Sequence, residues 1–209
     1  LFNFSLQIYQ NYYICLMALI SLKKEANTTI AVWETTESLD DFKNNINYKD
    51  IQNFKSKKRQ LQFLCTRLLL KEINKDLSIN YNRFGAPEIN NGQFISISHT
   101  DTLIAIVISD KKAGIDIEKI SNKALKVKSK FLTLNDKIQY NEDETILSWC
   151  AKETIFKWYQ KGNINFKDDI IIQSIKHYPI NNIHIKFKQN LFILKFLKIN
   201  NHFLVYVCK

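Results

Sequence analysis

The apolar residues of this chain change their spacing several times along its length, and this pattern limits the possible folds most strongly. From about Ile51 to Ile73 they recur at helical spacing, whereas over Gln93 to Ser109 the period changes to two, which is typical of strands. A polar helical region is predicted over about 121–143, and a second strong helix from about Asp143 to Gln160, with Gly162 and Asn163 as its stop. Residues 164–209 again resemble antiparallel strands. The chain therefore predicts the order β–α–β–β followed by β–α–β–β–β.

That order predicts an α+β fold made of two similar halves with pseudo-two-fold symmetry, in which antiparallel strands pack on helices. The halves are expected to meet near residue 110, giving an N-terminal half over 17–109 and a C-terminal half over 110–209. The only methionine is Met17, so we interpret residues 1–16 as an upstream extension. With 209 residues and 45% apolar content, the chain can bury a substantial core.

The net charge of +10 indicates a polyanionic partner, such as nucleic acid, a phosphorylated cofactor, an acidic protein or a membrane surface. The lysines are scattered along the chain, which argues against a dedicated nucleic-acid-binding arm. The four cysteines are far apart and no export signal is evident, which predicts reduced thiols and a cytoplasmic protein. The apolar stretch from Tyr12 to Ile20 is too short for a membrane span.

Two acidic side chains in the segment Gly114–Glu118 are candidates for a metal site. Residues two apart on a strand share a face, so Asp116 and Glu118 project together while Ile115 and Ile117 enter the core. Adjacent carboxylates repel unless a cation or basic neighbours offset them, and hard oxygen ligands favour Mg²⁺ or Mn²⁺. The alternative interpretation is a solvated strand edge.

A second candidate group lies in the later helix, where Glu153 and Lys157 are four residues apart and share a face. An ordinary surface ion pair is the alternative for these two residues. Trp149 and Phe156, in the same stretch, are predicted to be core residues. At the end of an earlier strand, His99 is either a phosphate contact or a turn histidine.

Taken in order, the chain carries G–x–P at Gly85, I–S–I–S–H ending at His99, G–I–D–I–E from Gly114 and W–x–A–K–E–x–x–x–K from Trp149. This series closely resembles the 4′-phosphopantetheinyl transferase superfamily, whose two signature motifs match Gly114–Glu118 and Trp149–Lys157. The resemblance extends from about Met17 to about Ile172. The chain length favours the surfactin-type branch, which has two pseudo-symmetric halves in one chain.

The resemblance implies an enzyme that moves 4′-phosphopantetheine from coenzyme A to a serine of an apo acyl or peptidyl carrier protein. It implies that Asp116, Glu118 and Glu153 hold Mg²⁺, with Mn²⁺ as the other possibility, and that Glu153 is the candidate base.

The same resemblance implies a set of coenzyme A contacts. Lys157 and Lys152 would offset charge on the pyrophosphate, and Ser98 and His99 would lie near the phosphates of the adenosine end. Arg67 on the first helix would be a second contact for the 3′-phosphate. No membrane or nucleic-acid partner is implied, and a monomer is expected.

Two positions depart from the family pattern. Ala86 stands where the G–K–P turn usually carries a basic residue, a role that Arg83 is a candidate to fill, and Gln62 stands where an acidic residue is common. Three alternatives remain open: a metal-dependent phosphodiesterase or nuclease, a basic nucleic-acid-binding protein, and a paralogue that holds carrier protein without catalysis. The carrier protein and its pathway do not follow from the sequence.

Overall fold

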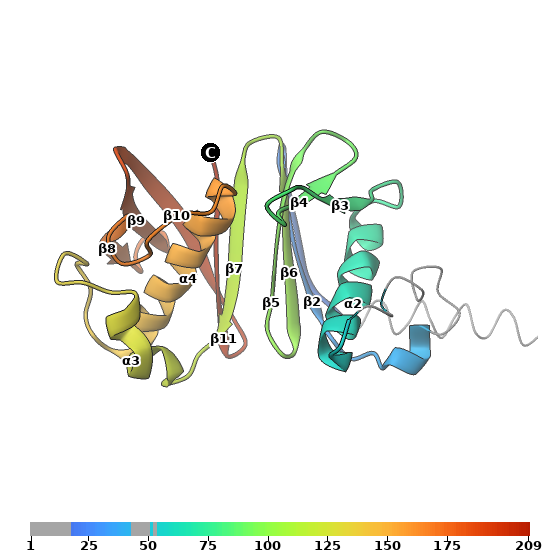
Figure 1. Ribbon diagram of the computed structural model, residues 1–209, viewed down its shortest axis with the longest axis horizontal. Helices are drawn as coiled ribbons and strands as arrows, with labels where there is room; N and C mark the ends of the chain where they lie inside the picture. Colours follow the sequence, from blue (N-terminus) through green and yellow to red (C-terminus); the bar gives the residue numbers. More distant parts are fainter. Residues whose placement is uncertain (1–17, 43–50, 52–53) are drawn as a thin grey trace, which may run out of the picture.

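Two antiparallel β-sheets lie between two long helices in the computed structural model of the protein (Figure 1). The structure describes residues 18–42, 51 and 54–209. The first sheet has the strand order β1-β2-β6-β5 and the second has the order β7-β11-β10-β9-β8. The predicted α+β class with antiparallel strands is therefore confirmed. Its pseudo-two-fold symmetry stays a prediction.

The first sheet and its helix α2 form the N-terminal part of the fold. The strands are β1 (Leu19–Glu25), β2 (Thr28–Glu34), β5 (Phe94–His99) and β6 (Leu103–Ser109). Helix α2 (Lys57–Ile73) crosses the sheet, beside the short helix η1 (Leu39–Phe42) and the hairpin β3 (Ile79–Tyr81) and β4 (Pro87–Ile89). The core between helix and sheet contains Trp33, Leu64 and Leu69, all at most 1% exposed. Burying each such side chain stabilises the fold by about 1.5–3 kcal/mol.

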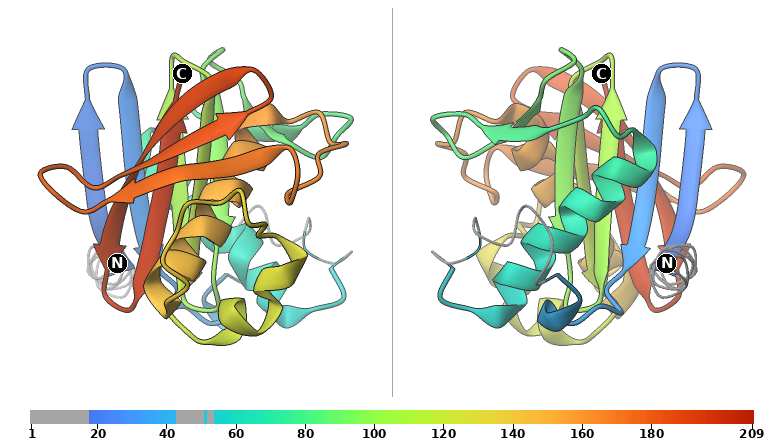
Figure 2. Two further views of the ribbon diagram at one scale, coloured as in Figure 1. Left: turned by 90° about the vertical axis from the view of Figure 1, so that its left-hand side faces the viewer. Right: turned by 90° about the vertical axis from the view of Figure 1, so that its right-hand side faces the viewer.

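The second sheet and helix α4 (Glu142–Tyr159) form the C-terminal part (Figure 2). The strands are β7 (Ala113–Lys119), β8 (Ile170–Lys176), β9 (Asn182–Phe187), β10 (Asn190–Ile199) and β11 (His202–Cys208). The short helices α3 (Lys123–Val127) and η3 (Lys128–Lys130) precede α4. Asn141 caps α4, because its side-chain oxygen accepts a hydrogen bond from the backbone N–H of Glu144.

The two sheets also pack against each other through a third apolar cluster. Val32 and Val107 from the first sheet meet Ile115 and Leu204 from the second, and all four are at most 1% exposed. The edge strands β5 and β7 are neighbours across this contact, and we call the line between them the seam. Because the inter-sheet core is shared by both parts, the division into domains at residue 110 stays a prediction.

Glycine at position 114 lets α4 approach β7 closely. A Cβ atom placed there would lie 2.3 Å from the carbonyl oxygen of Thr154, which is far inside van der Waals contact. The close approach places Glu153, the residue before Thr154, beside the strand that carries Asp116.

Several local predictions are corrected by the structure. The first helix begins at Lys57, not near Ile51, and the region predicted to be helical over 121–143 contains only α3, η3 and the start of α4. The hairpin β3–β4 was not predicted, because its three-residue strands are too short to show a period. Helix α4 ends as Gln160 turns to a positive φ of 62°, two residues before the predicted glycine stop at Gly162.

Residues 1–16 and Met17, which carry the predicted extension and start, lie outside the described residues. In the described part of the chain, no helix is both long and apolar enough to cross a membrane. Three of the four cysteines are described, and all three are free thiols: Cys65 and Cys150 are buried, and Cys208 is partly so.

Candidate active site

A continuous groove follows the seam. It consists of three cavities of about 760, 450 and 270 Å³. Arg59 and His99 line both the first and the second cavity, and Gly85 and Pro87 line both the second and the third. One wall comes from α2, the β3–β4 turn and β5, and the other comes from β7, α3 and α4. Both halves of the fold therefore contribute to one groove.

Asp116 is only 3% exposed and lines none of the three cavities, but its partner Lys157 lines the smallest of them. Its Oδ1 atom accepts a hydrogen bond from Ser98 Oγ at 2.7 Å and lies 2.7 Å from Lys157 Nζ. Its Oδ2 atom is buried and has no hydrogen-bond partner among the described residues. The nearby Cys150 thiol donates instead to the carbonyl oxygen of Phe203 at 3.6 Å. An unpartnered buried carboxylate oxygen is costly, so a ligand for it is expected.

Glu118 lines the largest cavity and is held by Trp149. The indole Nε1 donates a hydrogen bond to Glu118 Oε1 at 3.1 Å. The Trp149 ring lies between Phe131 and Phe166, with centroid distances of 5.1 and 5.7 Å. Burial, and then the charge of Asp116, raise the pKa of Glu118. Trp149 therefore packs in an aromatic cluster, but it is only partly buried and contacts the candidate metal ligand directly. Phe156, which was also predicted to be a core residue, is 37% exposed and lines the smallest cavity, so that prediction is wrong.

Glu153, on helix α4, interacts electrostatically with Asp116 and Glu118. Burial first, and then the charges of Asp116 and Glu118, raise the pKa of Glu153 to about 7, against the opposing charge of Lys157. The two strand carboxylates and the helix carboxylate therefore interact electrostatically. A carboxyl group with a pKa near neutrality can take up a proton at physiological pH.

The described side chains do not form a ready-made metal cluster of three or more carboxylate, imidazole or thiol groups. Lys157 and Trp149 engage two of the three predicted ligands, Asp116 and Glu118, and the assignment of these carboxylates to a metal ion stays a prediction. The donor set nevertheless fits a hard divalent cation. Three mutually repelling carboxylates and the unpartnered Oδ2 of Asp116 favour a positive charge at this position.

Cationic groups surround His99 on the opposite wall of the groove. Arg59 Nη1 donates to His99 Nε2 at 2.8 Å, since arginine has no acceptor. Burial lowers the pKa of His99, and the charges of Arg59, Lys157 and Lys58 lower it further. The imidazole is therefore kept neutral among three cations. This arrangement is suited to an anionic ligand such as a phosphate.

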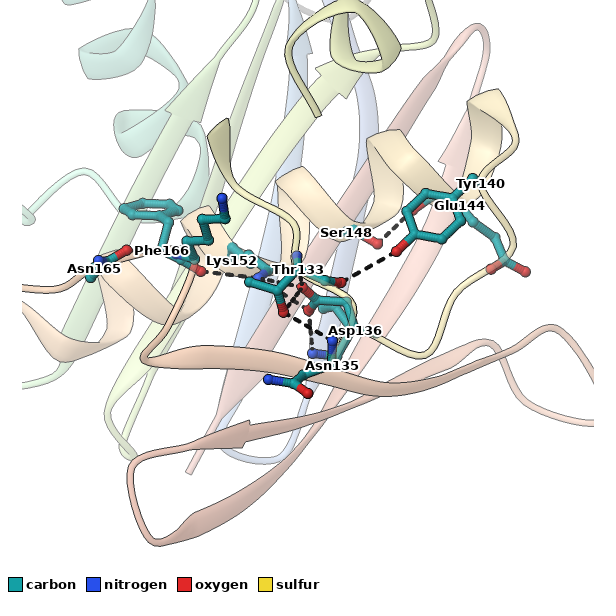
Figure 3. A network of polar contacts seen from close by, with 11 residues as sticks. Thr133, Asn135, Asp136, Tyr140, Glu144, Ser148, Lys152, Asn165 and Phe166 are labelled. Carbon is teal, nitrogen blue, oxygen red and sulfur yellow. Dashed lines mark hydrogen bonds and ion pairs between the residues drawn. The ribbon is translucent and has the colours of Figure 1, made fainter. Parts of the chain in front are cut away.

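The structure corrects the prediction that Lys152 contacts a cofactor. Its side chain is fully buried and forms an ion pair with Asp136, with Nζ 3.1 Å from Oδ1, and it donates to the carbonyl oxygen of Phe166 at 3.0 Å (Figure 3). The backbone N–H groups of Thr133 and Ile172 donate to the same Asp136 carboxylate. Lys152 is therefore a structural residue that joins α4 to the preceding loop.

Two further residues that were predicted to contact coenzyme A have other partners in the structure, and their coenzyme A contacts stay predictions. Ser98 is 5% exposed, and its hydroxyl donates to Asp116 instead of facing a phosphate. Arg67 lies over the ring of Phe63, 3.2 Å from its centroid, and lines none of the three cavities of the groove. The arginine of α2 that contacts His99 is Arg59, which lies eight residues earlier.

The two departures from the family pattern also have a place in the structure. Ala86 lines the smallest cavity, whereas Arg83 lies over Phe84 and lines none of the three. Gln62 is buried at the groove and donates to the carbonyl oxygen of Thr100 at 3.0 Å. The groove therefore has no basic side chain at the position of the G–K–P lysine.

Two residues of the site were missed as functional candidates, although the sequence contained a signal for each. Arg59 is spaced eight residues from Arg67, slightly more than two helical turns, so the two arginines were equivalent candidates on one helix. Trp149 opens the second motif, and its indole N–H needs a partner when it is buried. The identity of that partner depends on the packing of α4 on β7.

Comparison with known proteins identified a related chain. No protein-family model matches this sequence. The 4′-phosphopantetheinyl transferase gsp of Aneurinibacillus migulanus is 29% identical to it over 96 residues, which cover 43% of this chain and 40% of that protein. The matched region is thus less than half of the length of this curated relative. The resemblance to the 4′-phosphopantetheinyl transferase superfamily, first drawn from the motifs, is confirmed by this match.

Proposed function

We propose that this chain is a 4′-phosphopantetheinyl transferase that moves the phosphopantetheine group of coenzyme A to a serine of an apo acyl or peptidyl carrier protein. One observation carries the proposal. Three carboxylates interact with one another beside a groove that Glu118 and Lys157 line, and cations surround a neutral histidine in the same groove, which both halves of the fold line. Phosphoryl transfer mainly requires positioning and the neutralisation of charge, which these two groups would supply.

Asp116, Glu118 and Glu153 would hold Mg²⁺ or Mn²⁺ in this proposal. When bound, the ion would offset negative charge on the pyrophosphate. Lys157 is 26% exposed at its side chain and would share its charge between Asp116 and the pyrophosphate. Arg59, which replaces Arg67 in this role, would act with His99 on the phosphates of the adenosine end.

The transfer step forms one P–O bond and breaks another. The hydroxyl oxygen of the acceptor serine attacks the phosphorus next to the pantetheine, and Glu153 takes the hydroxyl proton. The bond from that phosphorus to the bridging oxygen breaks, and 3′,5′-ADP leaves with the electron pair. Lys157 and His99 would stabilise the charge that develops on the leaving group.

The partners follow from the same proposal. Coenzyme A is the co-substrate, and its three phosphate groups suit a chain of net charge +10. That charge would also steer an acidic carrier protein toward the groove. We propose a monomeric cytoplasmic enzyme whose two halves, each a helix packed on an antiparallel sheet, are related by pseudo-two-fold symmetry. The phosphodiesterase and nucleic-acid-binding alternatives are not favoured, since the related chain is named a transferase.

One assay tests the proposal. The protein is incubated with coenzyme A, Mg²⁺ and several apo carrier proteins, and each carrier is then weighed by mass spectrometry. A phosphopantetheine adduct that is lost with the Asp116→Ala and Glu153→Ala variants is the expected result. The absence of an adduct on every carrier would refute the transferase. Hydrolysis of a phosphodiester that requires Asp116 would instead support the phosphodiesterase.

A further inference from the structure

The seam between the two sheets is joined by serine hydroxyls. Strand β7 is the edge of its sheet, so the backbone N–H groups on its outer side have no strand partner. Ile115 N donates to Ser96 Oγ at 3.1 Å, and Ile117 N donates to Ser98 Oγ at 3.3 Å. The two serines, which lie two residues apart on β5, therefore take the place of carbonyl groups of a neighbouring strand.

Ser98 differs from Ser96 in one further contact. Its hydroxyl also donates to Asp116 Oδ1 at 2.7 Å. A serine hydroxyl has one proton to donate, so that proton is committed to Asp116 while the oxygen accepts from Ile117. Both serines are nearly inaccessible, with 2% of Ser96 and 5% of Ser98 exposed. Ser98 is therefore a fixed internal partner of the carboxylate.

The contact decides which oxygen of Asp116 is available. Ser98 and Lys157 both engage Oδ1, and the buried Oδ2 is left without a partner among the described residues. The carboxylate is thereby held in one orientation, with Oδ2 as the atom that can bind a cation. Asp116 lies on β7 of the C-terminal half and Ser98 lies on β5 of the N-terminal half.

We propose that Ser98 is a positioning residue for the metal site, which orients Asp116 from the other half of the fold and makes metal affinity depend on the seam. The inference rests on the proposed function, because it takes Asp116 as a metal ligand. Partners that orient a metal ligand typically contribute about 10- to 100-fold to metal affinity. Removing the Ser98 hydroxyl is expected to have an effect of that order.

The matched pair Ser98→Ala and Ser96→Ala isolates the contact, because both variants lose a seam hydrogen bond and only the first loses the bond to Asp116. Mn²⁺ is titrated into the protein without coenzyme A, and free Mn²⁺ is followed by electron paramagnetic resonance. We expect Ser98→Ala to weaken Mn²⁺ binding about 10-fold or more, and Ser96→Ala to change it by less than about twofold. Ser98→Thr, which keeps the hydroxyl, is expected to restore binding.

A second readout separates positioning from direct contact with coenzyme A. With saturating Mg²⁺, Ser98→Ala should leave the KM for coenzyme A unchanged while the Mg²⁺ concentration for half-maximal rate rises. If Ser98→Ala does not fold, Ser98→Cys, which has a similar shape and a weaker donor, should weaken Mn²⁺ binding at least about threefold. Equal Mn²⁺ affinity in the Ser98 and Ser96 variants would overturn this inference but would leave the proposed function standing. A wild-type protein that binds no Mn²⁺ would refute the metal site of the proposed function itself.

Discussion

Helix α4 carries two lysine–aspartate pairs that differ in how completely they are satisfied. Lys152 and Asp136 form a fully buried pair, and the carboxylate also accepts hydrogen bonds from the backbone of Thr133 and Ile172. Lys157 and Asp116 form a pair at the groove, where one oxygen of the aspartate has no partner among the described residues. The two lysines are five residues apart, so they point about 140° away from each other around the helix.

The difference separates a structural pair from a candidate functional one. A buried ion pair whose oxygens are all satisfied fixes the local structure and has no remaining capacity for a ligand. A pair with an unpartnered oxygen, beside two more carboxylates and a groove, keeps that capacity. The motif of α4 contains both lysines, so the distinction depends on what each lysine contacts.

The largest effect is expected from the aspartate at the groove. Asp116→Asn should lower transfer by more than about 1,000-fold, because a direct metal ligand contributes more than the 10- to 100-fold of an outer partner. The rate is measured by mass spectrometry of the carrier protein. Asp136→Asn is the matched control, which should cost stability while the folded fraction keeps its activity. Equal loss of activity in both variants would remove the distinction between the pairs.

Replacing each of the two lysines is expected to affect stability and activity in opposite order. Lys152→Met leaves the buried Asp136 without its cation and should lower the free energy of unfolding by about 3–5 kcal/mol. Lys157→Met, at a pair whose lysine is 26% exposed, should cost less stability than Lys152→Met and should instead lower transfer about 100-fold. Urea unfolding and transfer assays on the two variants measure both effects. A larger loss of stability for Lys157→Met would contradict the assignment.

The pH dependence of the free energy of unfolding tests whether Glu153 is buried beside the charge of Asp116. The pKa of Glu153 is raised from 4.5 to about 7 in the folded protein. Between these values the folded state holds a proton that the unfolded state lacks, so the free energy of unfolding should fall as pH rises, by at most about 3 kcal/mol.

Denaturant unfolding of the metal-free protein between pH 4.5 and 7 measures this dependence. Glu153→Gln should reduce the decrease, since glutamine has no proton to release, and leave the smaller part that Glu118 contributes through its own raised pKa. An unchanged slope in that variant would show that Glu153 is not the titrating group.

The contact between Trp149 and Glu118 is expected to have a smaller effect. Trp149→Phe keeps a ring between Phe131 and Phe166 but loses the indole donor, and should weaken Mn²⁺ binding about 10-fold. Trp158→Phe is the control, because that indole donates to the carbonyl oxygen of Lys209 at 3.4 Å, away from the carboxylates. Isothermal titration calorimetry compares the two variants, and similar affinities would dismiss the role of Trp149.

The smallest effect is expected for an exposed pair of the same charge type. Lys23 Nζ lies 2.7 Å from Glu25 Oε1, and the two side chains are 53% and 48% exposed. Solvent screens such a pair, so Lys23→Ala should not measurably change the urea midpoint. This variant gives the change in stability for a pair that contributes little, with which the two pairs of α4 can be compared. A change as large as that of Lys152→Met would undermine the argument from burial.

Much of the fold was predictable because the longer elements repeat their pattern many times. Helix α4 was predicted to within one residue at each end, at Glu142 and Tyr159, and the four strands after residue 164 were recovered in order. The hairpin β3–β4 was missed because its three-residue strands carry no period. The stretch over 121–143 was predicted to be more helical than it is. Its polar composition is compatible with a helix, but it has no continuous apolar face to pack against the core.

The sequence alone determined which residue types are present and which of them share a face. Asp116 and Glu118 must project to the same side of a strand, and Glu153 and Lys157 to the same side of a helix, because both facts follow from backbone periodicity. Periodicity does not specify what lies opposite each face.

Only the tertiary structure decided the partners. Packing of α4 on β7 through Gly114 brought Glu153 to the strand carboxylates. Ser98, which was expected to contact a phosphate, donates a hydrogen bond across the seam to Asp116. Lys152, which was expected to contact the pyrophosphate, is buried and pairs with Asp136. The physical reason is that burial and hydrogen bonding depend on groups far apart in the chain, such as Ser98 and Asp116, which local sequence patterns do not relate.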